Sequence, residues 1–145
     1  MYERFFDMRE RPFADRLDTR AFFSTPDREE ALAALECAAT FAAGHVLIAG
    51  EAGIGKTLLV RMFVSRLAQA ERAIILTPTV DGGLIHETCR KLNIGASGRG
   101  GTGRLFSRLQ RQLAKLATDG QRSILVIDQA ERLTIDQLME IEQLA

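Results

Sequence analysis

Hydrophobic residues along this chain fall into short continuous runs and into longer segments with helical spacing. The continuous runs cover residues 45–49, 73–77 and 123–127. Short apolar runs of this kind are typical of buried parallel strands. The helical segments cover residues 25–43, 57–70, 84–92, 104–117 and a last stretch that starts at residue 134. Residues 134–137 of that last stretch predict a capping box, with Leu138, Ile141 and Leu144 on the buried side of the helix. Because strands alternate with helices, the sequence predicts an α/β fold with a parallel sheet.

A phosphate-binding motif follows the first apolar run. Residues 50–57 read Gly-Glu-Ala-Gly-Ile-Gly-Lys-Thr and fit the pattern G-x-x-x-x-G-K-S/T at every fixed position. The glycines allow backbone conformations in which successive amides turn toward a phosphate, and the helix that follows adds the positive end of its dipole. The alternative is a glycine-rich turn without a ligand. We expect nine residues to bind the nucleotide, namely Gly50, Glu51, Ala52, Gly53, Ile54, Gly55, Lys56, Thr57 and Leu58.

Two of these residues have chemical roles that the motif specifies. Lys56 is predicted to place its ammonium on the β- and γ-phosphate oxygens of a nucleoside triphosphate. The Thr57 hydroxyl is predicted to coordinate a Mg²⁺ ion that keeps several of its waters. The third apolar run ends in Asp128, about 70 residues after the phosphate loop. Because ligands bind at the carboxyl edge of a parallel sheet, Asp128 is expected to hold the same ion, through a water molecule.

The residues after Asp128 leave the catalytic step open. In P-loop ATPases that use a glutamate to activate water, that glutamate usually follows the metal-binding Asp, whereas this chain has Gln129, with an acid only at Glu131. An amide cannot accept a proton as a carboxylate can. Either Glu131 acts as the base, or Gln129 only orients water and hydrolysis is slow. Glu131 can also be a solvated or capping acid with no catalytic role.

Several segments together resemble a known family, the general secretion pathway protein A (ExeA-type) AAA+ ATPases. They are Met1-Tyr2-Glu3-Arg4-Phe5-Phe6, Arg11-Pro12-Phe13, residues 22–26, residues 28–32, the phosphate loop, Thr77-Pro78-Thr79 and residues 127–133. The resemblance covers nearly the whole chain. The family usually reads Asp-Glu-Ala-Gln where this chain has Asp-Gln-Ala-Glu at residues 128–131. The base assignment therefore departs from the family pattern.

The resemblance implies a P-loop NTPase fold of the AAA+/ASCE type, with a parallel sheet between two helical layers. It implies ATP and Mg²⁺ as ligands, a homo-oligomer, and a protein partner in a secretion or cell-envelope complex. It places Pro12, Phe13 and residues 28–32 near adenine, with hydrophobic packing as the alternative. It also implies a further strand with a sensor residue and a helical lid. We therefore expect residues 1–145 to be one AAA+ domain, incomplete at its C-terminus, with an N-terminal part at 1–43 and the P-loop core at 44–145.

Composition agrees with a compact ATPase core. The 145 residues are 46% hydrophobic and carry 19 basic and 19 acidic residues, so no overall field attracts nucleic acid or lipid. The longest apolar stretch, residues 40–50, is too short to span a membrane. Cys37 and Cys89 form no C-x-x-C pair, which favours reduced, buried thiols and a cytoplasmic location.

One helical segment has an uneven charge pattern. Arg104, Arg108, Arg111 and Lys115 follow at steps of four, three and four residues, which puts them on one stripe of a helix. Leucines at 105, 109, 113 and 116 lie on the opposite face. Such a stripe is usually a solvated surface, and the alternative is an anionic partner such as a nucleic-acid backbone.

Three alternatives to a secretion-linked ATPase remain at this stage. The first is a DNA-associated AAA+ protein of the transposition-target or helicase-loader type. The second is a nucleotide switch that does not hydrolyse ATP, which Gln129 favours. A small-molecule kinase is weaker, since no acceptor pocket can be named from the sequence.

Overall fold

The computed structural model describes residues 2–8, 18–41, 44–68, 70–78, 83–95 and 101–144. Two parallel strands, β1 (Glu71–Leu76) and β2 (Arg122–Ile127), pair in register from Glu71 opposite Arg122 to Leu76 opposite Ile127. The pairing extends one residue further, because the Asp128 amide donates a 2.9 Å hydrogen bond to the Leu76 carbonyl. The sheet therefore extends to Asp128, one of the two expected magnesium ligands.

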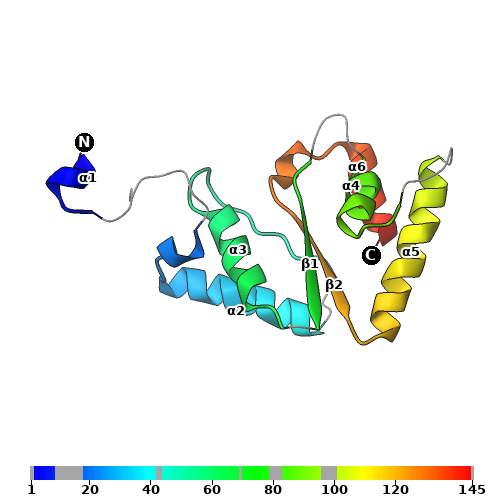
Figure 1. The fold of residues 1–145 in the computed structure, drawn as a ribbon, viewed down its shortest axis with the longest axis horizontal. Helices are drawn as coiled ribbons and strands as arrows, with labels where there is room; N and C mark the ends of the chain where they lie inside the picture. Colours follow the sequence, from blue (N-terminus) through cyan, green and yellow to red (C-terminus); the bar gives the residue numbers. More distant parts are fainter. Residues whose placement is uncertain are drawn as a thin grey trace.

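Helices lie on both sides of this sheet (Figure 1). On one side are α2 (Pro26–Phe41) and α3 (Lys56–Arg66), and on the other are α4 (Leu84–Lys91), α5 (Thr102–Thr118) and α6 (Ile135–Leu144). Three short pieces complete the elements, which are α1 (Tyr2–Phe5) and the 3₁₀ turns η1 (Thr19–Ala21) and η2 (Ala130–Arg132). The result is the three-layer α/β arrangement with a parallel sheet that the sequence predicted.

The larger of two hydrophobic cores fills the space between the sheet and α4 and α5. It combines β1 side chains with one face of each helix, and its buried members are Ile74, Leu76, Leu84, Ile85, Cys89, Leu92, Leu105, Leu109 and Leu116. The predicted leucine face of α5 is confirmed, since three of its four leucines are buried and Leu113 packs against them. This packing determines which side of α5 faces outward.

The smaller core joins α2 and α3. Its buried members are Leu32, Leu59 and Phe63, and Ile124 of β2 packs against them. Arg122 adds a polar link, because its guanidinium donates a 2.9 Å hydrogen bond to the Ala39 carbonyl near the end of α2. These contacts hold the helix that follows the phosphate loop against the strand that ends at Asp128.

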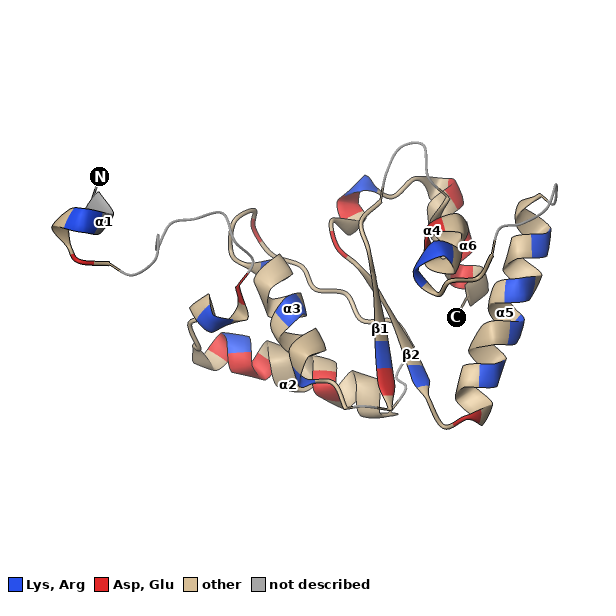
Figure 2. Ribbon diagram, viewed as in Figure 1, with Lys and Arg blue, Asp and Glu red and all other residues tan. Residues whose placement is uncertain are grey.

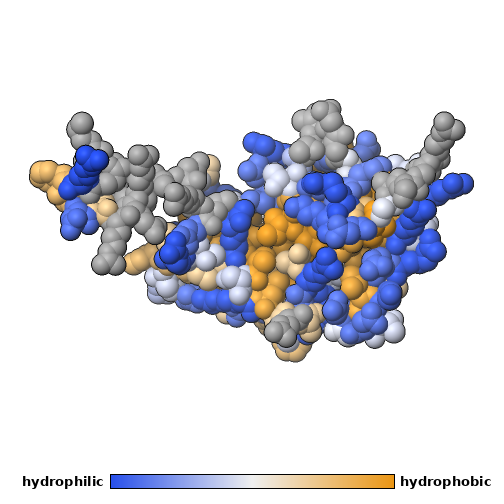
Figure 3. Space-filling model, viewed as in Figure 1, coloured by the Kyte–Doolittle hydropathy of each residue, from blue (hydrophilic) through white to orange (hydrophobic). Residues whose placement is uncertain are grey.

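The prediction of a buried strand at residues 45–49 is wrong for this structure. The segment is not hydrogen-bonded into the sheet, and Val46 and Leu47 expose 50% and 82% of their surface. Apolar side chains gather near the middle of the face of the molecule that is shown in Figure 3. A strand exists only where a neighbour pairs with its backbone, and no described segment pairs with residues 45–49. No described residue forms the further strand that the family resemblance implies.

Smaller differences concern the ends and faces of helices. The helix expected at 57–70 ends at Arg66, because Leu67 adopts an extended backbone conformation. The capping box that starts α6 is confirmed by two hydrogen bonds between Thr134 and Gln137, at 3.0 and 3.3 Å. Leu138, expected on the buried side of α6, is exposed, and Gln137 is buried instead. Of the two cysteines predicted to be buried, Cys89 is buried and Cys37 is exposed.

Candidate functional site

The phosphate loop leads directly into α3, as the motif predicts. Gly55 caps the helix N-terminus with a φ of +99°, and Gly53 has a φ of +80°; residues with a Cβ rarely adopt such values. In the part of the chain that the structure describes, no amide N–H of residues 51–56 donates a hydrogen bond. Unpaired amides at a helix N-terminus form an anion-binding site.

The Lys56 side chain folds back over the same loop. Its ammonium donates 2.9 Å hydrogen bonds to the carbonyl oxygens of Gly50 and Glu51. Residues 50–54 are exposed, whereas Gly55, Lys56, Thr57 and Leu58 are half-buried. The positive charge therefore lies at the mouth of the loop, accessible to a phosphate from solvent.

Thr57 and Asp128 come together although 71 residues separate them. The Thr57 hydroxyl lies 3.1 Å from each oxygen of the Asp128 carboxylate. Two backbone contacts hold Asp128 there, since its own amide bonds to Leu76 and its Oδ1 accepts a 3.1 Å hydrogen bond from the Gln129 amide. The tertiary structure thus joins the end of β2 to the first turn of α3.

This pair suits a magnesium ion. A hydroxyl and a carboxylate are hard oxygen ligands, and Mg²⁺ is usually bound by one or two protein oxygens together with substrate phosphates and water. Among the described residues, no three His, Cys, Asp or Glu side chains cluster as a metal cage. An ion at Thr57 and Asp128 would therefore take most of its ligands from phosphate and water.

Arg28 is a contact that sequence reasoning did not find. Its guanidinium donates hydrogen bonds to the carbonyls of Phe23, at 2.8 Å, and Ile54, at 3.2 Å. The resemblance placed residues 28–32 near adenine, and within that range Leu32 is fully buried in the smaller core. No motif marks an arginine that bonds to a loop 26 residues away. Pro12 and Phe13, also expected near adenine, lie outside the described residues.

The two candidates for water activation follow Asp128 closely. Gln129 is exposed and has a φ of +61°, a left-handed conformation that is uncommon for a residue other than glycine. Glu131 is exposed in η2, and within the described part of the chain its side chain makes no hydrogen bond or ion pair. Among the residues that the structure describes, neither side chain has a hydrogen-bond or ion-pair partner.

The layered fold, the phosphate loop and the Thr57–Asp128 pair define a P-loop NTPase. A protein family described as an AAA domain matches residues 39–145. The chain therefore belongs to this AAA domain family, and so to the nucleotide-binding ATPases. It is also 30% identical over 135 residues to General secretion pathway protein A of Aeromonas hydrophila, which confirms the similarity to ExeA-type AAA ATPases.

The match to that relative covers 92% of this chain but only 25% of the relative, so the chain spans about a quarter of its length. No solved structure matches the chain. None of the helices that the structure describes has both the length and the apolar character needed to cross a membrane.

Proposed function

We propose that this chain binds ATP with Mg²⁺ at the phosphate loop and hydrolyses it. The observation that carries the proposal is the Thr57–Asp128 contact, because it brings the two expected magnesium ligands to one place beside the loop. The bound ion would offset charge on the β- and γ-phosphates. Lys56 would exchange its two carbonyl partners for phosphate oxygens, and the free amides of the loop would take the remaining oxygens.

Two residues of this chain are candidates for activating the attacking water. Glu131 is a carboxylate that could accept the proton of an attacking water, and Gln129 could only orient that water. Phosphoryl transfer depends mainly on positioning and electrostatic stabilisation, so orientation by Gln129 would support slow turnover. If neither residue acts, the chain is a nucleotide switch, in which ATP binding alone favours one conformation.

The cellular role that we propose is assembly of a secretion or cell-envelope machine, by a homo-oligomer in the cytoplasm. The support is the similarity to General secretion pathway protein A, whose name refers to secretion. Because the match covers a quarter of that protein, its partners are carried over here only as part of the proposal.

ATP binding and hydrolysis by Lys56→Ala provide the first test. Charge-assisted hydrogen bonds contribute about 1.5–3 kcal/mol, so loss of the Lys56 ammonium should weaken Mg-ATP binding by about 10-fold or more in calorimetry. Arg61→Ala is the matched control, because Arg61 is an exposed cation on the same helix. If Lys56→Ala bound and hydrolysed ATP like the wild type, the proposal would fail.

Two further variants assign the catalytic step. Glu131→Gln should abolish phosphate release while Mg-ATP binding stays unchanged if Glu131 is the base. Gln129→Glu should raise the rate if the site is limited by the missing acid. No hydrolysis by the wild type, with tight Mg-ATP binding, would select the switch instead.

A further inference from the structure

The charges of this chain are separated along the sequence. Residues 88–118 contain seven Lys and Arg and none of the 19 acidic residues. Because the whole chain has equal numbers of both, the remainder carries seven more acids than bases. A neutral protein therefore has one strongly basic segment, in the region of α4 and α5.

The tertiary structure turns four of these cations outward on α5. Arg104, Arg108, Arg111 and Lys115 are all exposed, and Figure 2 shows the cations along the length of this helix. The stripe spans twelve residues, and the eleven steps from Arg104 to Lys115 correspond to ~16 Å of helix. No aspartate or glutamate occurs in α5, and none of these four cations makes an ion pair within the described parts of the chain.

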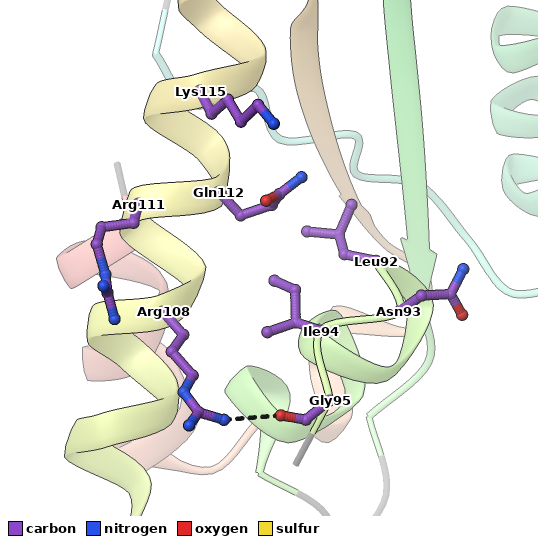
Figure 4. Close-up of a pocket in the computed structure, with 8 residues that line it drawn as sticks. All are labelled: Leu92, Asn93, Ile94, Gly95, Arg108, Arg111, Gln112 and Lys115. Carbon is purple, nitrogen blue, oxygen red and sulfur yellow. Dashed lines mark hydrogen bonds between the residues drawn. The ribbon is translucent and has the colours of Figure 1, made fainter. Parts of the chain in front are cut away.

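A hollow lies beside the stripe. It has a volume of about 440 Å³ and lies between α5 and the segment that follows α4, and Figure 4 shows its lining. The lining residues are Leu92, Asn93, Ile94, Gly95, Arg108, Arg111, Gln112 and Lys115, with no acid among them. Arg108 donates a 2.9 Å hydrogen bond to the Gly95 carbonyl, which links α5 to the segment after α4 (Figure 4). Three cations and two amides thus line one concave surface.

The four cations of the stripe do not stabilise α5 itself. Like charges three or four residues apart repel each other on a helix. Arg104 also lies in the first turn, near the positive end of the helix dipole, where a cation is unfavourable and where α5 carries no acid. A polyanion bound along the stripe would remove both penalties.

We propose that this basic face, defined as the α5 stripe together with its hollow, binds the phosphate backbone of double-stranded nucleic acid without reading its sequence. Three of the four stripe cations are arginines, whose guanidinium bonds phosphate in a bidentate manner. One strand of a duplex carries a phosphate every ~3.4 Å of its axis, so a stripe of this length faces about five phosphates.

Two other polyanions fit the face less well. A single strand is usually bound by stacking of bases on aromatic side chains, and neither the stripe nor the hollow contains one. A lipid surface is usually bound by an amphipathic helix that also inserts apolar side chains. The large exposed hydrophobic residues of the described chain include none from α5.

Fluorescence anisotropy of a labelled duplex DNA, titrated with the purified protein, tests the proposal. With four phosphate contacts, log K should fall with log salt at a slope near −3.6, so affinity should drop about 100-fold between 50 and 200 mM salt. Arg108→Gln/Lys115→Gln should reduce that slope by about two units and weaken binding at low salt about 10-fold or more. Its melting temperature should change little, because the relief of like-charge repulsion offsets the lost Arg108–Gly95 hydrogen bond.

The control is Arg61→Gln/Arg72→Gln, which removes the same charge from exposed positions on α3 and β1. Equal weakening by the control would overturn the proposal, as would binding that does not respond to salt. Preference for phosphatidylserine vesicles or for polyglutamate over the duplex would also overturn it, in favour of a lipid or an acidic protein. Duplex binding retained in Lys56→Ala, with ATP binding lost, would show that the face acts independently of the phosphate loop.

Discussion

Arg28 of α2 and Ile54 of the phosphate loop are joined by a 3.2 Å hydrogen bond from a guanidinium nitrogen to a backbone carbonyl. The same guanidinium bonds the Phe23 carbonyl and lies 5.8 Å from the centre of the Phe22 ring. One side chain therefore connects the residues before α2 to the loop that is expected to bind phosphate.

Replacing Arg28 should weaken nucleotide binding without removing a phosphate ligand. A typical net hydrogen-bond contribution of about 0.5–1.5 kcal/mol predicts that Arg28→Ala raises the dissociation constant of Mg-ATP about 2- to 10-fold, because the loop loses a support. Isothermal titration calorimetry measures this change. Arg61→Ala should leave the affinity unchanged, and equal losses in both variants would contradict a specific role for Arg28.

Replacement by alanine should have opposite effects on stability at two glycines, Gly103 within α5 and Gly120 just after it. Gly120 has a φ of +74° and follows the helix, where its amide bonds the Ala117 carbonyl, so Gly120→Ala should destabilise the fold by about 1–2 kcal/mol. Gly103 lies inside the helix, and the space that a Cβ would occupy there is open, so Gly103→Ala should stabilise the fold by about 0.5 kcal/mol. Urea unfolding measures both changes in the free energy of unfolding. Changes of the same sign in the two variants would contradict the end of α5 at Thr118 and the left-handed conformation of Gly120.

Glu29 should make the α2–α3 contact sensitive to acid. A hydrogen bond from Ser24, followed by one from Arg66, lowers the pKa of Glu29 below its ordinary value of 4.5. The folded state therefore favours the carboxylate, and this stabilisation is present above pH 4.5 and is lost as the pH falls through the lowered pKa. The melting temperature of Glu29→Gln should lie below that of the wild type at about pH 6 and converge with it in acid.

Glu30→Gln is the control for that comparison, because Glu30 is an exposed neighbour that forms no ion pair in the described structure. Its melting temperature should match the wild type across the same pH range. A constant difference between Glu29→Gln and the wild type down to about pH 3 would contradict the assigned interaction.

The two thiols should react with iodoacetamide at different rates. Cys37 is exposed on α2, whereas Cys89 is 2% exposed and burial raises the pKa of its thiol. Since the thiolate is the reactive form, mass spectrometry of the native protein should find the label on Cys37, and on both residues only after unfolding. Rapid labelling of Cys89 in the native state would show that α4 and α5 do not pack as described.

Local chemistry explains which elements could be predicted. The phosphate loop, the capping box at Thr134 and Gln137, and the leucine face of α5 all depend on residues within a few positions of one another. The apolar runs that became β1 and β2 also followed the expected pattern. The roles of Lys56, Thr57, Asp128, Gln129 and Glu131 in catalysis stay predictions until they are measured.

The sequence by itself determined the nucleotide-binding motif, the acid at the end of β2 and the helical periodicity, because each depends on residues that are close together in the sequence. Only the tertiary structure decided that residues 45–49 stay unpaired, that Arg28 bonds Ile54, and that Thr57 contacts Asp128. Those outcomes depend on which distant backbone or side chain is near enough to pair. Hydrophobic pattern reports a preference for burial, whereas pairing requires a partner in space.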